Sequence, residues 1–214
     1  MTSSGDDANA ALVCPPSDKE RLENRNADDQ LEYITWLIGN DALELRESYL
    51  LKLHELCIAD IYPCGGKYRT VLFKVWIENS AHEIPEAAVV PSLVREAVDW
   101  LNANRGKRSA LECAAYALWR LNWIHPFAGG NGRTARAVAY YLVCAGNGSM
   151  LPGSRVMPDL IYPRREEYIA ALQAVDASAL ASDEPDFSAM TLFLRDILTT
   201  QLASAIERLS NPGC

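Results

Sequence analysis

Apolar residues recur along most of this chain with the period of an α-helix. From about residue 28, Leu31, Ile34, Leu37 and Ile38 share one helical face. Further segments with this pattern cover residues 43–57, 91–102, 110–123, 132–145, 165–175 and 187–209. Two of these segments, 110–123 and the part of 132–145 beyond its first turn, are almost continuously apolar. This is typical of helices at the centre of a bundle. The pattern therefore predicts a mainly α-helical fold.

The pattern changes between residues 62 and 77. Residues 62–68, Tyr-Pro-Cys-Gly-Gly-Lys-Tyr, have the composition of a turn, and residues 69–77 alternate as a half-buried strand does. We therefore expect one β-hairpin and little other sheet. Residues 1–20 are small, polar and proline-containing, which predicts a flexible N-terminal arm. Residues 21–214 are predicted to form a single domain.

Composition and charge narrow the classes of function. The chain has 214 residues, 49% of them apolar, which is enough for one sizeable core. No apolar run approaches the length of about eighteen residues that predicts a membrane span. The net charge of −8 argues against general binding of nucleic acid, because phosphate contacts need a basic surface. The six cysteines show neither a CxxC pair nor a metal-ligand spacing, and they fit a reducing cytoplasm.

The two most apolar segments are joined by the sequence HPFAGGNGRTAR, residues 125–136. We call residues 125–132 the glycine-rich loop. Its glycines, Gly129, Gly130 and Gly132, permit positive φ and a close approach of a ligand to the backbone. Successive N–H groups in such a turn, together with the start of the following helix, favour an anion. Arg133 and Arg136 share a helical face and suit phosphate, so the segment predicts a polyphosphate site.

His125 directly precedes this site and is fixed in the chain by Pro126. A neutral imidazole there can accept the proton of an attacking hydroxyl while the phosphate is held by the amides. General-base catalysis of this kind contributes about 10²–10⁴-fold in rate. A glycine-rich connection between helices is often only a turn, and exposed arginines are often only solvated. The combination of histidine, glycines and two arginines between apolar helices favours the functional interpretation.

The segment resembles the signature of Fic domains, HPFx(D/E)GNGRxxR, and departs from it at one specified position. Three shorter stretches resemble the same family: Gly-Lys-Tyr-Arg at 66–69, Trp-Leu-Asn at 100–102 and Arg-Glu-Glu-Tyr at 165–168. The resemblance covers roughly residues 25–200. It implies a Fic-type helical bundle with one β-hairpin flap and, for most members, transfer of AMP from ATP to a hydroxyl side chain of a target protein.

The resemblance also implies a role for each matching residue. His125 would be the general base, and Arg133 would act with it in catalysis. The residues implied in binding nucleotide and phosphate are Phe127, Gly129, Gly130, Asn131, Gly132, Arg133 and Arg136. The flap, residues 64–69, would dock the target by main-chain pairing, through Gly65, Gly66, Lys67 and Tyr68. The implied partners are a nucleoside triphosphate and a target protein, with neither nucleic acid nor a membrane.

Gly129 stands where the family usually has the Asp or Glu that holds Mg²⁺. Mg²⁺ can accompany ATP, but this usual protein ligand is absent, and we predict no metal site made by the chain itself. Three outcomes follow. The protein transfers AMP with a metal held by water and phosphate, or uses another phosphate-containing donor, or is a weak or inactive nucleotide binder.

Many Fic proteins carry an inhibitory helix, (S/T)xxxE(G/N), whose glutamate pairs with the second signature arginine. The nearest segment here is Lys19-Glu-Arg-Leu-Glu-Asn24, which makes Glu23 a candidate inhibitory residue and has lysine at the Ser/Thr position. A solvated helical turn explains the segment equally well, and a separate inhibitory partner is an alternative. His54 lies on the apolar face of its predicted helix, where a structural role is favoured over ligand binding.

Overall fold

The computed structural model describes residues 11–73, 75, 82–182 and 184–210 of the 214-residue chain. Its main helices are α1 (Lys19–Gly39), α2 (Glu47–Ile58), α3 (Val90–Asn104), α4 (Ala110–Ile124), α5 (Asn131–Asn147), α6 (Met157–Ile161), α7 (Arg165–Ala181) and α8 (Ser188–Ser210). Short 3-10 turns precede α1 and α3 and join α6 to α7. No helix in the described ranges has the length and apolarity needed to span a membrane.

The core is built around α4 and α5, as the pattern of nearly continuous apolar residues predicts. These two helices make the most extensive helix–helix contact in the described part of the chain. Both carry several buried alanines, Ala114, Ala115 and Ala117 on α4 and Ala135 and Ala139 on α5. Small side chains allow close approach of two backbones, and the large Tyr140 and Tyr141 then fill the space around the pair.

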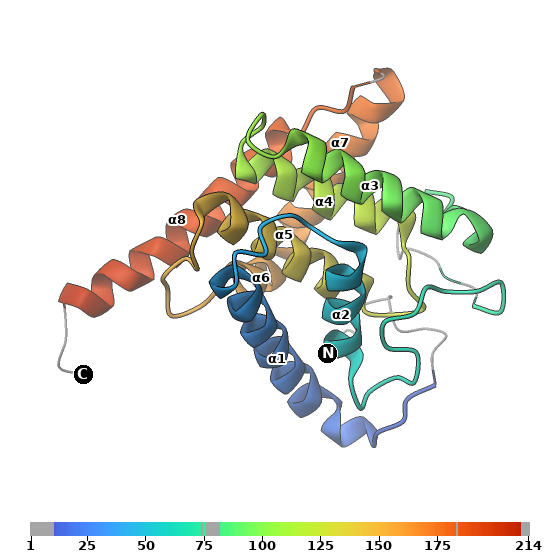
Figure 1. The fold of residues 1–214 in the computed structure, drawn as a ribbon. Helices are drawn as coiled ribbons and strands as arrows, with labels where there is room; N and C mark the ends of the chain where they lie inside the picture. The colour runs from blue at the N-terminus through green and yellow to red at the C-terminus, as the bar shows by residue number, and fades with distance from the viewer. Residues whose placement is uncertain (1–10, 74, 76–81, 183, 211–214) are drawn as a thin grey trace.

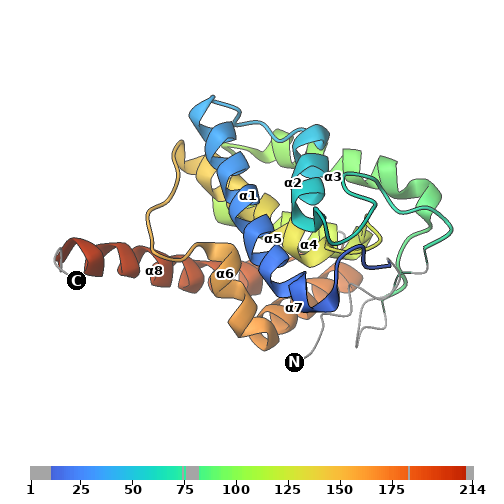
Figure 2. The ribbon, with the colours of Figure 1, turned by 90° about the horizontal axis from the view of Figure 1, so that it is seen from below.

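Figures 1 and 2 show the other helices around this central pair. Helices α1 and α2 pack against each other and against α5, and α3 packs along α4. Helix α8 contacts α4, α6 and α7, and its C-terminal end extends beyond the bundle in both views. The glycine-rich loop, between the end of α4 and the start of α5, therefore lies at one end of the central pair, beside α2.

Local signals set the ends of the central helices. At the start of α4, the Ser109 hydroxyl accepts a hydrogen bond from the Glu112 N–H at 3.2 Å, and the Glu112 carboxylate accepts one from the Ser109 N–H at 2.9 Å. This reciprocal capping box satisfies two N–H groups that have no helical partner. Helix α5 ends at Gly148, whose φ of 72° is the left-handed conformation that stops a helix.

Several predicted boundaries differ from the observed ones. Helix α1 begins at Lys19, about nine residues before the predicted start, and so includes the last two residues of the predicted arm 1–20. The reason is that its inner face continues through buried polar residues, Asn26 and Gln30, which a search for apolar periodicity does not detect. Helix α6, five residues long with a proline, was not predicted.

The predicted β-hairpin is not confirmed. The described residues contain no strand, only a single bridge between Arg105 and Arg108. Residues 70–73 form a turn, in which the Phe73 N–H donates to the Thr70 carbonyl at 3.0 Å. Residues 74, 76 and 77, three of the nine in the predicted strand, lie outside the described residues. The mainly α part of the predicted fold class is confirmed, and the hairpin stays a prediction.

Candidate functional site

His125 forms the C-terminal cap of α4 in a left-handed conformation, with φ 50° and ψ 60°. Its N–H still donates to the Leu121 carbonyl at 3.0 Å, and the residue is buried. A left-handed conformation costs a residue with a Cβ about 1–2 kcal/mol, so the surroundings must hold it in place. Backbone strain of this kind is common where a side chain must be aimed at a site.

The group that holds His125 in place is the buried guanidinium of Arg69. Its Nε donates to the His125 carbonyl at 2.7 Å, and its Nη2 donates to the carbonyls of Ile124 and Pro85. The backbone N–H of Arg69 donates to the Pro126 carbonyl at 2.9 Å. A cation suits this place because the last carbonyls of α4 form the negative end of the helix dipole. Arg69 thus fixes the chain on both sides of the His125 Cα.

The glycine-rich loop keeps its shape through Asn131. The Asn131 side chain accepts from the Phe127 N–H at 2.9 Å and donates to the Phe127 carbonyl at 3.0 Å, closing the loop on itself. The side chains of Asn131 and Phe127 are both buried. These two side chains therefore form the scaffold of the loop, and any contact with nucleotide at these positions falls to the main chain.

Gly130 is the position in the loop where glycine is required. Its φ is 74°, and a Cβ added there would lie 2.7 Å from Ile58 Cγ2 and 3.2 Å from Cys57 Sγ. Helix α2 thus forms the floor under the loop, and a side chain would push the two apart. Gly132 lies inside the first turn of α5, where N–H groups have no carbonyl partner within the helix. This is the geometry of an anion site at a helix N-terminus.

Arg133 and Arg136 follow on the first turns of α5 and are half-buried. The Glu23 carboxylate of α1 lies 3.0 Å from Nη1 of Arg133. Glu23 therefore pairs with Arg133, the first arginine of the loop segment, where the resemblance implies the second. Lys19 lies 3.8 Å from the same carboxylate, at the position where the inhibitory pattern has Ser or Thr. A carboxylate thus contacts a side chain that is predicted to bind phosphate.

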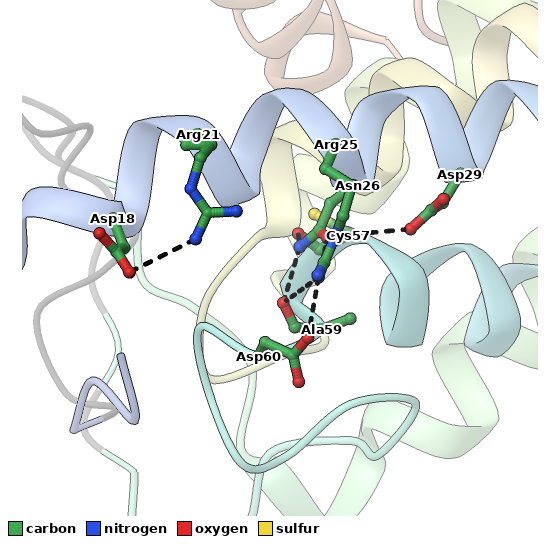
Figure 3. A network of polar contacts seen from close by, with 8 residues as sticks. All are labelled: Asp18, Arg21, Arg25, Asn26, Asp29, Cys57, Ala59 and Asp60. Carbon is green, nitrogen blue, oxygen red and sulfur yellow. Dashed lines mark hydrogen bonds and ion pairs between the residues drawn. The ribbon is translucent and has the colours of Figure 1, made fainter. Parts of the chain in front are cut away.

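Helix α1 is tied to the C-terminal end of α2 by polar side chains (Figure 3). The buried Asn26 amide donates to the carbonyls of Cys57 at 3.2 Å and Ala59 at 2.9 Å. Arg25 forms an ion pair with Asp60 at 3.0 Å, and Gln30 donates to the Leu53 carbonyl at 2.7 Å. These bonds fix the position of Glu23 relative to the loop, because Glu23 lies one turn before Asn26 on the same helix.

The flap segment, residues 64–69, folds back over α2. The Gly66 N–H donates to His54 Nδ1, the Lys67 N–H to the Cys64 carbonyl, and the Tyr68 hydroxyl to the Glu47 carboxylate at 2.8 Å. The main-chain donors of Gly66, Lys67 and Arg69 are thus used within the chain. Pairing of a target strand through these donors would require the segment to rearrange. The next residues, Val71 and Leu72, are more than 80% exposed.

The glycine-rich loop lacks the carboxylate that the resemblance implies as a ligand of Mg²⁺. Within the described ranges, no three His, Cys, Asp or Glu side chains lie together as metal ligands would. Gly129 supplies no carboxylate, and its carbonyl lies 3.1 Å from His54 Nε2. Mg²⁺ prefers oxygen ligands and is usually held by one or two protein carboxylates together with substrate phosphates and water. The loop itself therefore offers no carboxylate ligand for Mg²⁺.

The fold and the loop define a helical domain with a glycine-rich turn between its two central helices. Residues 44–143, just under half of the chain, match the profile of the Fic/DOC family. A curated relative, protein adenylyltransferase fic-1 of Caenorhabditis briggsae, is 29% identical over 177 residues, which are 80% of this chain. The match spans only about a third, 32%, of the length of that relative.

Two solved structures are similar in fold. Fic-1 of C. elegans has a TM-score of 0.66 at 25% identity, over 93% of this chain and 54% of that chain. A Fic domain containing signaling protein from Bacteroides thetaiotaomicron has a TM-score of 0.68 at 20% identity, over 90% of this chain and 73% of that one. The second likeness, at its low identity, concerns the fold alone.

Two residues of the site were missed or undervalued in the sequence. Arg69 lies within the segment predicted to be a strand, and no spacing in the sequence connects it with His125, 56 residues later. His54 was assigned a structural role from its place on an apolar face. It is indeed buried, yet both ring nitrogens contact segments of the candidate site, Gly66 and Gly129.

Proposed function

We propose that this protein transfers AMP from ATP to a hydroxyl side chain of a target protein. The observation that carries the proposal is the arrangement of the loop. A histidine is held at the end of α4 by Arg69, and an anion-binding turn at the start of α5 follows it within seven residues. The names of the relatives, protein adenylyltransferases, support the same reaction.

In this reaction, the main-chain N–H groups of Gly130, Asn131 and Gly132 bind the α- and β-phosphates of ATP. Arg133 and Arg136 bind the β- and γ-phosphates and neutralise the charge of the leaving pyrophosphate. His125 accepts the proton of the target hydroxyl as its oxygen bonds to the α-phosphorus. The bond from the α-phosphorus to the bridging oxygen breaks, and pyrophosphate leaves. The protein contributes mainly position and charge, as is usual in this chemistry.

Glu23 is the proposed inhibitory residue. Its carboxylate pairs with Arg133 and competes with phosphate for the same guanidinium. The polar contacts of Asn26 and Arg25 with the end of α2 hold it there (Figure 3). Inhibition by a separate partner protein is the alternative, and it predicts no effect of Glu23 on nucleotide binding.

A weak nucleotide-binding protein is the second candidate function, and one observation favours it. Gly129 removes the carboxylate that the resemblance implies for Mg²⁺, while the turn itself remains formed. A transferase using a different phosphate-containing donor is consistent with the same loop.

The test is incubation of the purified protein with ATP labelled at the α- or the γ-phosphate, with and without Mg²⁺, alone and with lysate proteins. We expect label from α-labelled ATP only, and a loss of about 10²-fold or more in His125→Ala, while that variant still binds ATP. Label from γ-labelled ATP would contradict AMP transfer.

Gly129→Asp is the matched variant for the metal question. A gain in transfer that depends on Mg²⁺ would show that the missing carboxylate limits the natural rate. Label from this variant, and none from the natural protein, would favour the second candidate function.

A further inference from the structure

His54 is a buried polar side chain of α2 that contacts both the flap segment and the glycine-rich loop. It is 1% exposed and contacts these two segments through both ring nitrogens and the face of its ring. Its Nδ1 accepts the hydrogen bond of the Gly66 N–H at 3.1 Å, and its Nε2 lies 3.1 Å from the Gly129 carbonyl. Its ring stacks on Phe127, with centroids 3.6 Å apart and planes 7° apart.

These contacts fix the chemical state of the ring. Nδ1 faces an N–H donor and must therefore be unprotonated. The proton of the neutral ring is on Nε2, which donates it to the Gly129 carbonyl. Burial lowers the pKa of His54 to about 4, so the ring is neutral at ordinary pH. A protonated ring would present a second N–H to the Gly66 donor and break that contact.

The two segments that His54 joins have different roles in the proposed reaction. Gly66 belongs to the flap segment, which is proposed to dock the target, and Gly129 belongs to the loop that is proposed to bind the phosphates. Gly66 has a φ of 68° and lies against α2, where an added Cβ would be 3.2 Å from the Leu51 carbonyl. Gly130, directly after Gly129, lies closer still to α2, since an added Cβ would be 2.7 Å from Ile58 Cγ2. Both segments are therefore seated on the same helix, and His54 bonds to each.

We propose that His54 is a positioning residue that holds the flap segment and the phosphate-binding turn in one fixed relation, so that nucleotide binding at the turn also stabilises the flap segment. This inference rests on the proposed function for the meaning of the two segments. The physical link between them is a property of the free protein and is measurable without any reaction.

Three substitutions separate the two bonds. The Asn side-chain oxygen occupies about the place of Nδ1, so His54→Asn keeps an acceptor for Gly66 and loses the donor to Gly129. The Gln amide reaches about the place of Nε2, so His54→Gln keeps the donor and loses the acceptor. His54→Phe keeps the stack on Phe127 and loses both bonds. Leu53→Val, the neighbouring core position on α2, controls for a general loosening of the helix.

The first readout is exchange of the backbone amide hydrogens of Gly66 and of residues 130–132, followed by NMR. A hydrogen bond of about 1.4 kcal/mol corresponds to about a tenfold change in exchange. We expect Gly66 to exchange about tenfold faster in His54→Gln and His54→Phe, but not in His54→Asn. At residues 130–132 we expect faster exchange in His54→Asn and His54→Phe, but not in His54→Gln.

The second readout is ATP binding by calorimetry, without Mg²⁺. We expect the dissociation constant to rise about threefold to tenfold in His54→Asn and His54→Phe, and to stay near the natural value in His54→Gln. In the natural protein, ATP should also slow exchange at Gly66, and this effect should vanish in all three variants.

The inference is overturned if Asn and Gln change both ends equally, or if no variant exceeds Leu53→Val. It is also overturned if bound ATP leaves Gly66 exchange unaltered in the natural protein. A natural protein that does not bind ATP refutes the proposed function instead, and the exchange pattern of the free variants then decides alone whether His54 joins the two segments.

Discussion

Arg69 shows how a single side chain can serve a site that it does not enter. It is 6% exposed and makes its contacts with main-chain carbonyls, two of which belong to Ile124 and His125. Burial lowers its pKa, yet a guanidinium remains charged at any ordinary pH. Its planar fork reaches several carbonyls at once, which a lysine ammonium on a flexible stem does not do. We therefore assign Arg69 as a positioning residue for His125.

Arg69→Lys should reduce the rate of AMP transfer and leave ATP binding nearly unchanged. The positive charge stays, but the carbonyls of His125 and Ile124 lose their common donor, and the left-handed cap is less well held. The loss of one such buried contact costs about 1–3 kcal/mol, or roughly fivefold to 150-fold in the population of the aligned state. The measurement is kcat for transfer beside the calorimetric dissociation constant of ATP. A change in ATP affinity with an unchanged kcat would contradict a positioning role.

At the scale of elements, α1 is the helix that connects the site to the rest of the bundle. Its inner face is apolar toward its C-terminus, at Ile34 and Leu37, and polar toward its N-terminus, at Asn26 and Gln30. The polar part is held by hydrogen bonds from Asn26 to the carbonyls of Cys57 and Ala59 at the end of α2, and from Gln30 to the Leu53 carbonyl. This half of α1 places Glu23 on Arg133.

Glu23→Gln should increase ATP affinity. The Glu23–Arg133 pair is partly exposed, with side chains 32% and 22% accessible, so its strength is closer to that of a surface pair than of a buried one. A loss of about 1 kcal/mol of competition corresponds to roughly a fivefold lower dissociation constant. Glu20→Gln is the matched control, since Glu20 is exposed on the same helix and the change of charge is the same.

Asn26→Ala tests the same arrangement from the other end of the contact. It keeps the Glu23 side chain but removes the donor to the carbonyls of Cys57 and Ala59, which holds this part of α1 against α2. Glu23 should then be held less firmly on Arg133, so ATP affinity should increase, as in Glu23→Gln. If neither Glu23→Gln nor Asn26→Ala alters ATP binding relative to Glu20→Gln, then α1 does not compete with the nucleotide.

At the scale of the whole molecule, the central pair α4 and α5 and the helices around it form a single framework on which the loop is mounted. His54 belongs to both the framework and the site, so its protonation affects the stability of the whole. In the folded protein its pKa is lowered from 6.5 to about 4, first by burial and also by the charge of Arg133. The Gly129 contact opposes this shift.

The free energy of unfolding should therefore fall as the pH drops from about 6.5 to about 4. In that range the unfolded chain binds a proton on His54 that the folded protein does not, so acid favours unfolding. Above pH 6.5 the contribution is fully present. Its size is about 3 kcal/mol, at about 1.4 kcal/mol for each unit of pKa. Urea unfolding at pH 7 and at pH 4.5 measures it.

The control for this measurement is His54→Phe, which has no group to titrate at this position. The carboxylates titrate in both proteins, so the difference between the two isolates His54. We expect the natural protein to lose more stability than His54→Phe between the two pH values. Parallel losses would mean that the folded pKa of His54 is not lowered.

The sequence by itself determined the mainly helical class and the central place of α4 and α5, and it predicted the segment that we propose carries the chemistry. These features are local: apolar periodicity sets which residues face a core, and the spacing from His125 to Arg136 lies within one loop and one helix. Helix α1 was partly missed because buried Asn26 and Gln30 interrupt that periodicity, and their partners lie on another helix.

Only the tertiary structure decided which distant residues join the loop. Arg69, His54 and Glu23 lie far from residues 125–136 in the chain, and each reaches the loop because α1, α2 and the flap segment pack beside it. For Glu23, the resemblance implies a pairing with an arginine of the loop segment, and in the structure that arginine is Arg133. No sequence pattern predicts the contacts of Arg69 and His54, because both side chains bond to main-chain groups, which do not depend on the residue type. The chemistry of the loop is local in sequence, whereas its positioning depends on the packing of the whole domain.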